Sequence, residues 1–393
     1  MRFKLLAAIS VVVLAIVPTT NSAAALRMEQ IPSVFAELTN DKTLANPAMV
    51  LMDLNSGAIV YSRDPNGLRK PASTLKLMSA FSALEYLPAE KTFTTTIYKT
   101  DIKNAFQIVG DFDPSITPSQ KLSNNLKFVW SDNLVGQIRK VAKSRYLKIR
   151  YYGLTDRTKA NMSNSFRRVG YHITWEALNS ENSAAHVTEQ IYSATSPNLN
   201  EILHYTLLFS DNWVADYLAK SAAVAAGYGY NSAGIEAVFA EVLAKYSIEG
   251  GVVQAKDGSG LSHEDRTSAA TLARVLATMY SNPKFQGAIQ GLPVGGVSGT
   301  LIHRFVKTAP QAVGLVQAKT GSINGVVSLA GFVDSGERKY AFAIITDRLR
   351  HTYKIESAAR ATIDKLLGKI AAPMQIVTAT DVAPSPSPEA SAN

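Results

Sequence analysis

Cysteine is absent from this sequence of 393 residues. The protein therefore forms no disulfide and no thiolate metal site, and its stability must come from its apolar core. Histidine is also sparse, and the six residues show no HxxxH spacing: His172, His186, His204, His263, His303 and His351. None of them lies in a context that indicates a Ser-His-Asp triad. We therefore expect no metal site and no cofactor.

The sequence also lacks an apolar run of the length that spans a membrane, which is about 20 residues. The apolar stretch from Leu5 to Val17 is shorter, and Pro18 ends it. Arg2 and Lys4 precede this stretch, and small residues follow it up to Ala25. This pattern predicts a signal peptide in residues 1–25 and no stable membrane span. We expect secretion across the cytoplasmic membrane, to the periplasm or the cell wall.

Acidic residues are fewer than basic ones, with 31 Asp and Glu against 40 Lys and Arg. The predicted leader holds two of the basic residues and none of the acidic ones, so the mature chain carries a formal charge of +7. The basic residues are dispersed except around 139–150, which does not indicate a nucleic-acid surface. An excess of positive charge would favour the anionic polymers of a cell wall.

The first motif is Ser73-Thr74-Leu75-Lys76, followed by apolar residues at helical spacing. Three residues make almost one helical turn, so Lys76 is predicted to lie within reach of the Ser73 hydroxyl. A helix N-terminus and a second lysine would lower the pKa of Lys76 and make it a proton acceptor. A second SxxK occurs at 281–284, but its internal proline makes it a poor start for a buried helix.

The second motif occurs twice, as Ser131-Asp132-Asn133 and as Ser210-Asp211-Asn212. The later copy interrupts two apolar periodic runs, which predicts a polar loop held between two buried helices. Such a loop can point a hydroxyl and an amide rigidly into a cleft. The earlier copy lies in a stretch dense in Lys and Arg, and we interpret it as a surface turn.

The third motif is Lys319-Thr320-Gly321, with alternating apolar residues before and after it. The pattern predicts adjacent strands of an antiparallel sheet, joined by short glycine turns. On an edge strand, the lysine and the hydroxyls can bind a carboxylate, and Gly321 lets the backbone approach closely.

Taken together, the three motifs resemble those of the SxxK serine acyltransferases. More closely, the chain resembles the class C low-molecular-mass penicillin-binding proteins, the D-alanyl-D-alanine carboxypeptidase/endopeptidase family. The resemblance runs from about residue 45 to about residue 368. Further matching stretches are Pro71-Ala72-Ser73, Gly110 to Pro114, Ser196 to Leu203, Asp257 to Ser262, Gly299-Thr300-Leu301 with Arg304, and Ala330-Gly331-Phe332.

The resemblance implies an α/β fold of the DD-peptidase/β-lactamase kind, with an antiparallel sheet flanked by helices. Ser210 follows Ser73 by 137 positions, fewer than the family's usual two-domain insertion requires. We expect a catalytic domain made of residues 26–90 and 190–370, and a smaller β-rich inserted domain at 91–189 with a strand at Leu147 to Tyr152. Residues 371–393 are rich in Pro, Ser and Ala and are predicted to form a disordered tail.

The resemblance also assigns catalytic roles. Ser73 would attack the carbonyl between two D-alanines while Lys76 takes its proton. Ser210 and Lys319 would pass a proton to the leaving amine. Asn212 would orient the substrate amide.

Substrate binding is assigned to the third motif. Thr320 and Ser322 would bind the terminal carboxylate beside Gly321, with Lys319 supplying positive charge. The backbone N–H groups of Ser73 and Ser322 would hold the oxyanion.

The implied partners are peptidoglycan stem peptides as substrates and β-lactam antibiotics as covalent inhibitors of Ser73. One alternative is a serine β-lactamase on the same fold, which is disfavoured because no ExxLN segment lies between Asn212 and Lys319. Another is a non-catalytic protein that binds β-lactams or peptidoglycan, although a pure binder needs neither lysine. The sequence predicts neither an oligomeric state nor the balance between carboxypeptidase and endopeptidase activity.

Overall fold

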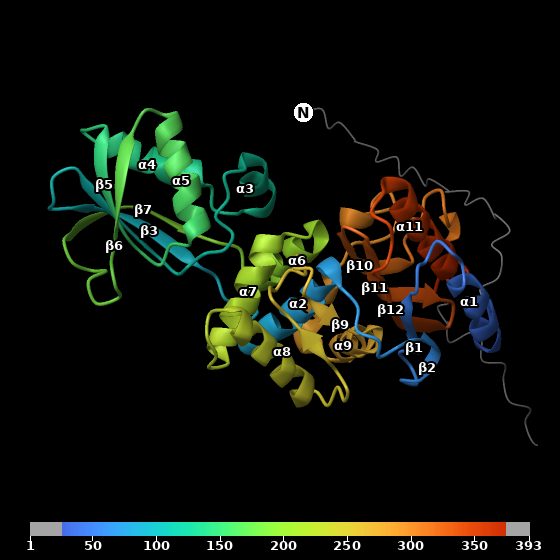
Figure 1. The fold of residues 1–393 in the computed structure, drawn as a ribbon. Helices are drawn as coiled ribbons and strands as arrows, with labels where there is room; N and C mark the ends of the chain where they lie inside the picture. The colour runs from blue at the N-terminus through green and yellow to red at the C-terminus, as the bar shows by residue number, and fades with distance from the viewer. Residues whose placement is uncertain (1–25, 375–393) are drawn as a thin grey trace, which may run out of the picture.

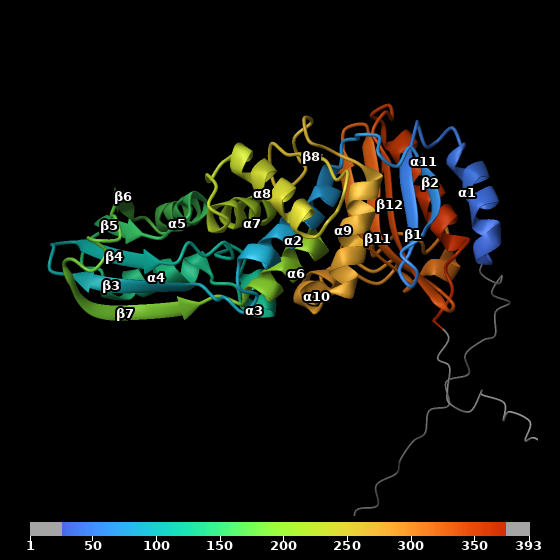
Figure 2. The same ribbon diagram turned by 90° about the horizontal axis from the view of Figure 1, so that it is seen from below.

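The computed structural model describes residues 26–374. The predicted leader and nearly all of the predicted tail lie outside the described residues. Two bodies of unequal size form an elongated molecule, with one sheet in each (Figures 1 and 2). No helix within residues 26–374 combines the length and the apolar character needed to cross a bilayer.

The larger sheet has five antiparallel strands in the order β10-β11-β12-β1-β2. Its strands are β1 (Ala48–Asp53), β2 (Ile59–Arg63), β10 (Val316–Ile323), β11 (Val326–Ser335) and β12 (Arg338–Thr346). β10 is an edge strand and carries the Lys319 motif. The predicted antiparallel sheet is therefore present, and the motif lies on its edge.

Helices cover both faces of this sheet (Figure 2). On one face lie α1 (Ile31–Thr39) and α11 (Tyr353–Gly368). On the other lie α2 (Lys76–Tyr86), α6 (Leu199–Phe209), α7 (Asn212–Ala225), α8 (Ser232–Lys245), α9 (Ala269–Ser281) and α10 (Gln286–Gln290). Successive side chains of a strand point to opposite faces, so β1 is buried along its whole length and contributes to both apolar clusters.

The smaller sheet contains β3 (Thr94–Thr100), β4 (Ala105–Gly110), β5 (Tyr146–Tyr152), β6 (His172–Ala177) and β7 (Val187–Thr195). Their order is β6-β5-β4-β3-β7, and the β4–β5 and β5–β6 pairs are parallel. β5 confirms the strand predicted at Leu147 to Tyr152. β7 continues past residue 189, where we placed the end of the insert.

Two helices that the sequence did not predict pack against the smaller sheet: α4 (Ser131–Val141) and α5 (Asp156–Arg168). A third, α3 (Gln120–Leu126), lies toward the larger body (Figure 1). The smaller sheet shares with α4 and α5 an apolar cluster of its own, formed by residues between Ile97 and Phe166.

The interpretation of Ser131 as part of a surface turn was wrong. Ser131 is the first residue of α4, and it is fully buried. Leu134, Val135 and Ile138 follow at helical spacing and pack into the cluster of the smaller sheet. The many Lys and Arg residues nearby hid this amphipathic pattern.

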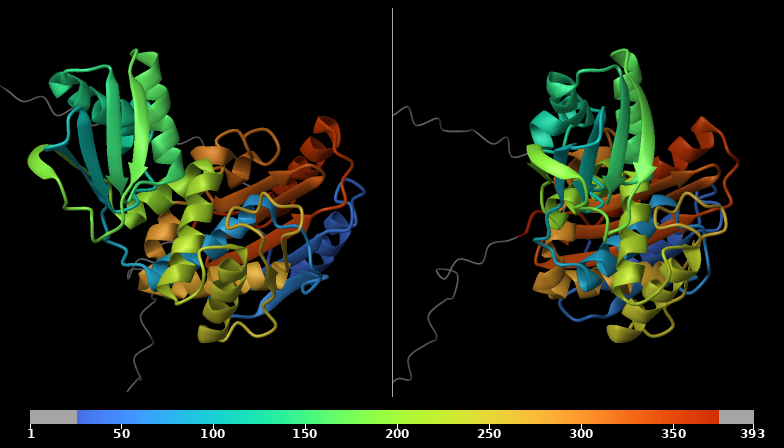
Figure 3. Two further views of the ribbon diagram at one scale, coloured as in Figure 1. Left: turned by 60° about the vertical axis from the view of Figure 1, so that its left-hand side comes forward. Right: turned by 90° about the vertical axis from the view of Figure 1, so that its left-hand side faces the viewer.

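The chain leaves the larger body and returns to it at one place. The N–H of Ser196 donates to the Phe93 carbonyl at 2.8 Å, and the Phe93 N–H donates to the Ser196 hydroxyl at 2.9 Å. A further contact joins the bodies, because the Tyr217 hydroxyl of α7 donates to the Phe112 carbonyl at 2.7 Å. Figure 3 shows the smaller sheet projecting beyond this junction.

The end of the described chain packs against the larger sheet. Ala371 is buried, and Ala372 forms an isolated bridge with Ser335 at the end of β11. The packed chain thus extends two residues into the predicted tail, because these residues satisfy backbone groups at the β11–β12 turn.

Candidate active site

Ser73 lies in a 3₁₀ turn, η2 (Ala72–Leu75), which leads directly into α2 at Lys76. The Nζ of Lys76 donates to the Ser73 Oγ at 2.8 Å, so the contact expected from their spacing is present. Ser73 keeps partial exposure, whereas Lys76 is 1% exposed. The result is a reachable hydroxyl beside an amine that is shielded from water.

Lys76 has two further partners, both oxygen atoms that accept from it. Its Nζ donates to the Asn212 Oδ1 at 2.7 Å and to the Ser259 carbonyl at 2.7 Å. An ammonium has three N–H donors, and here all three are used. When Lys76 is neutral, it keeps two donors and gains a lone pair. Of the three partners only the Ser73 hydroxyl can become the donor, so the lone pair is directed at the Ser73 hydroxyl.

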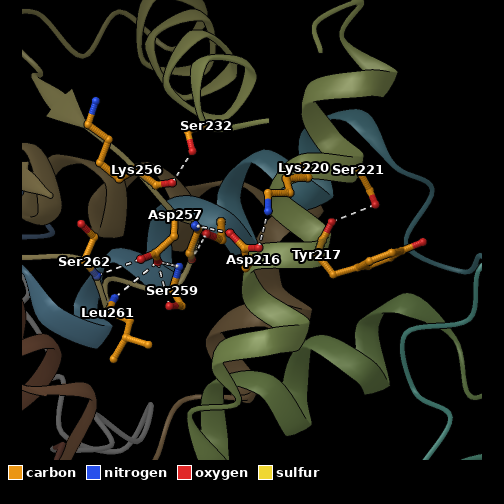
Figure 4. A network of polar contacts seen from close by, with 12 residues as sticks. Asp216, Tyr217, Lys220, Ser221, Ser232, Lys256, Asp257, Ser259, Leu261 and Ser262 are labelled. Carbon is orange, nitrogen blue, oxygen red and sulfur yellow. Dashed lines mark hydrogen bonds and ion pairs between the residues drawn. The ribbon is translucent and has the colours of Figure 1, made fainter. Parts of the chain in front are cut away.

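The Ser259 carbonyl is held in place by a loop built around Asp257 (Figure 4). The Asp257 carboxylate accepts from the backbone N–H groups of Ser259, Gly260 and Ser262, at 2.6 to 2.8 Å. This loop was matched to the family pattern from the sequence, but no role in the site was predicted for it. Its contribution is a backbone carbonyl, which the identity of a side chain does not reveal.

The second motif joins α6 to α7 in the way its flanking sequence predicts. Ser210 ends α6 in a left-handed conformation with φ of 62°. Asp211 caps α7 by accepting from the Val214 N–H at 2.9 Å, and Asn212 is the first residue of that helix. The turn places Asn212 against Lys76. The Ser210 hydroxyl has no hydrogen-bond partner within residues 26–374.

Side chains alternate along β10, so the residues of the third motif point to opposite faces of the sheet. Lys319 is fully buried on the side of Lys76, and its Nζ donates to the Thr320 carbonyl at 3.0 Å. Thr320 and Ser322 lie on the opposite side, toward α11. Gly321 packs closely against the turn that carries Ser73, since a Cβ there would collide with the Ser328 hydroxyl and lie 2.7 Å from the Pro71 carbonyl.

Burial controls the protonation of both lysines. It lowers the pKa of Lys76 to about 8, while the charges of Asp257 and Asp211 act in the opposite direction. Burial also holds the pKa of Lys319 well below its usual value, and the positive charge of Lys76 adds to this effect. We had expected a helix N-terminus and a second lysine to lower the pKa of Lys76, but the main cause is the removal of water.

The second SxxK segment forms no comparable pair. The Ser281 hydroxyl donates to the Thr278 carbonyl at 3.1 Å at the end of α9. The Nζ of Lys284 instead binds the Glu85 carboxylate at 2.7 Å. The internal proline starts a separate 3₁₀ turn and breaks the helical spacing, as the sequence predicted.

The chain is similar in sequence to known carboxypeptidases. A D-alanyl-D-alanine carboxypeptidase of Actinomadura is 37% identical to this chain over 165 residues, which cover 40% of this chain and 30% of that protein. The penicillin-sensitive carboxypeptidase A of Dictyostelium discoideum is 32% identical over 188 residues, 45% of this chain and 35% of that protein. These matches thus span about a third of the length of the relatives.

Similarity in fold extends further. The crystal structure of penicillin binding protein 4 from Haemophilus influenzae superimposes with a TM-score of 0.66 at 17% identity, covering 84% of this chain and 98% of that chain. The model of the D-Ala-D-Ala carboxypeptidase 3 (S13) family matches residues 33–156 and 132–370. Most of the described chain is therefore covered, and the protein belongs to the S13 family of D-Ala-D-Ala carboxypeptidases.

Proposed function

We propose that this protein is a serine-type D-alanyl-D-alanine carboxypeptidase that trims peptidoglycan stem peptides through an acyl-enzyme on Ser73. The observation that carries the proposal is the hydrogen bonding of Lys76. Its three partners leave the neutral amine only one group from which it can take a proton, which is the Ser73 hydroxyl. This arrangement suits acyl transfer at a carbonyl carbon.

Attack begins when neutral Lys76 accepts the Ser73 proton and the oxygen adds to the carbonyl between two D-alanines. The Ser73 N–H lies in the first turn of η2, where N–H groups have no acceptor within the helix. It can therefore donate to the oxyanion together with the Ser322 N–H. Ser210, whose hydroxyl is uncommitted, passes a proton from the lysine pair to the leaving amine. Water then releases the acyl group.

The remaining roles follow from position. Asn212, fixed by Lys76, orients the substrate amide. Thr320 and Ser322 bind the terminal carboxylate on the outer side of β10. The substrates, cell-wall peptides, lie outside the cytoplasmic membrane, in agreement with the leader predicted for residues 1–25. We place the enzyme in the periplasm or the cell wall and assign catalysis to the body made of residues 26–90 and 190–370.

A β-lactamase is less well supported by the contacts around Lys76. The two carboxylates that act on this lysine are Asp257 and Asp211. Asp257 accepts a set of backbone N–H groups, and Asp211 caps α7. Burial alone would raise the pKa of Asp257, but its hydrogen bonds to Ser259 and to neighbouring backbone N–H groups hold that pKa below its usual value, so Asp257 is a poor base for a deacylating water. A penicillin acyl-enzyme is therefore expected to persist.

Incubation with benzylpenicillin followed by intact-protein and peptide mass spectrometry tests the proposal. We expect one covalent adduct on Ser73, none in Ser73→Ala, and an undiminished adduct in the control Ser281→Ala. The same preparation should release D-alanine from a peptide that ends in D-Ala-D-Ala. Rapid penicillin turnover without an adduct would indicate a β-lactamase. Labelling without release of D-alanine would indicate a non-catalytic binder.

A further inference from the structure

Arg360 of α11 touches the carboxylate-binding side of the edge strand. Its Nη2 donates to the Ser322 hydroxyl at 2.9 Å. The two residues are 38 positions apart, and no sequence pattern had connected them. The Arg360 side chain is 26% exposed, so its guanidinium is open to a ligand.

This contact fixes the direction in which the Ser322 hydroxyl can donate. A guanidinium has five N–H donors and no acceptor, so Ser322 must accept from Arg360. The hydroxyl proton of Ser322 is then available to a ligand. Beside it, the hydroxyls of Thr300 and Thr320 lie 2.8 Å apart, and whichever of them donates to the other, the pair keeps one O–H for a ligand.

Arg360 itself retains unused donors. Its side-chain hydrogen bonds within residues 26–374 involve only Nη2, which also donates to the Glu356 carboxylate at 3.3 Å. Glu356 is anchored by the Gly325 N–H at 3.2 Å and by the His351 ring at 2.9 Å. Glu356 therefore holds the guanidinium over Ser322, while the N–H groups of Nε and Nη1 each stay available to donate a single hydrogen bond to a carboxylate.

The other cation near this strand, Lys319, is poorly placed for that task. Its side chain is fully buried on the opposite face of β10 from Thr320 and Ser322. Burial and the charge of Lys76 also lower its pKa, which favours the neutral amine. A guanidinium stays positively charged in proteins, so Arg360 can supply the charge that a buried, neutral lysine cannot.

We propose that Arg360 is the cation that recognises the C-terminal carboxylate of the substrate, together with the hydroxyls of Ser322 and the Thr300–Thr320 pair. The inference rests on the proposed carboxypeptidase function and deepens it. It assigns the binding of the substrate carboxylate to Arg360, outside the three motifs, and no longer to Lys319. Lys319 then takes part only in the proton transfers around Lys76.

Two peptides that differ only at their end test the assignment: one ends in D-Ala-D-Ala with a free acid, the other in the same residues with a terminal amide. For the wild type we expect kcat/KM for the acid to exceed that for the amide about 10- to 100-fold, the range of a hydrogen bond to a charged group. Arg360→Gln should lower this ratio at least fivefold by slowing only the acid. Arg360→Lys should restore part of it. Lys365→Gln, which removes a charge from an exposed position of the same helix, should change nothing.

The outcomes separate the inference from the function on which it rests. If the wild type releases no D-alanine from the acid peptide, the proposed function fails whatever Arg360 does. If the wild type is active but Arg360→Gln keeps its preference for the acid within twofold, Arg360 is not the carboxylate receptor. A purely structural role would slow the acid and the amide equally, and it too would overturn the inference. Unchanged melting temperatures in both Arg360 variants exclude misfolding.

Discussion

At the scale of single residues, the most informative group is the Lys76 amine. Because burial lowers its pKa to about 8, a large part of Lys76 is neutral in weakly alkaline solution. The base form is the deprotonated one, so acylation should accelerate as the pH rises and level off above the pKa. Below it, the rate should fall about tenfold per pH unit.

The first prediction is therefore a pH profile. The rate constant for acylation of Ser73 by benzylpenicillin, followed by mass spectrometry from pH 6 to 9.5, should reach half of its maximum near pH 8 and level off above it. Lys76→Arg keeps a positive charge but cannot give up its proton, and it should lose about 10²- to 10⁴-fold in rate. Lys365→Arg, on the surface of α11, is the matched control. A flat wild-type profile between pH 6 and 8 would remove Lys76 from the role of base.

Contacts between neighbours in sequence could be predicted at this scale, and contacts between distant residues could not. The Ser73–Lys76 pair follows from the geometry of one helical turn. The Ser259 carbonyl is 183 positions from Lys76, and it enters the site as a backbone group with no signature in the sequence. Arg360 reaches Ser322 only because α11 packs against the larger sheet.

At the scale of elements, the same tripeptide occupies two different helix starts. Ser210 ends α6, and Ser131 begins α4 in the smaller body, where it is buried. Neither hydroxyl has a hydrogen-bond partner among residues 26–374. Ser210→Ala should therefore lower peptidase turnover by about two orders of magnitude or more, as expected for loss of a proton-transfer group.

Ser131→Ala is the matched comparison, and it should keep turnover within a few-fold. Its buried hydroxyl makes no hydrogen bond, so its removal should not lower the melting temperature. Measuring D-alanine release for both variants under one set of conditions decides between the copies. The opposite ranking would mean that the loop after α6 does not serve catalysis.

A third prediction concerns the close contact between β10 and the turn that carries the nucleophile. The Pro71 carbonyl accepts from the Ser328 hydroxyl at 2.6 Å, and Gly321 leaves room for this contact. Gly321→Ala would push the strand away from η2. Because a misplacement of about 1 Å can cost about 10²-fold in rate, D-alanine release should fall by that order.

Gly314→Ala serves as the control for Gly321→Ala, because a Cβ at Gly314 meets nothing within 4 Å. Its positive φ of 81° adds some backbone strain, so it also tests whether strain near β10 is enough to impair the enzyme. If Gly321→Ala keeps full activity, the register of β10 against η2 is not critical.

Strands were predicted more reliably than helices at this scale. The apolar residues around Lys319 indicated the antiparallel strands, because a strand buried on both faces is apolar throughout. α5 was missed because its sequence is strongly polar, and its buried side is formed only by Thr158, Met162, Ser165 and Phe166. A buried face this narrow is difficult to distinguish from a surface loop.

At the scale of the whole molecule, the apolar clusters divide the protein into parts of separate stability. The fully buried residues in the cluster of the smaller sheet all lie between Ile97 and Phe166. The larger body has two apolar clusters, one on each face of its sheet, and the helices that carry the site pack into them. The bodies meet at Phe93 and Ser196 and also where Arg157 of α5 contacts Asp211 and Trp213. The smaller sheet nevertheless has an apolar core of its own, which allows each body to open with its own free energy.

Covalent occupation of Ser73 should therefore stabilise one body and not the other. A β-lactam acyl group would contact η2, α7 and β10, so local unfolding that disrupts these contacts becomes less favourable. Hydrogen exchange followed by mass spectrometry on the full chain should show slower exchange in α2, α7 and β10 after acylation. Exchange in β4, β5 and β6 should be unchanged, since no residue of these strands belongs to the site. Ser73→Ala treated with the same penicillin provides the baseline. Equal protection of both sheets would show that the two bodies open as one cooperative unit, and the smaller sheet would then contribute directly to the stability of the site.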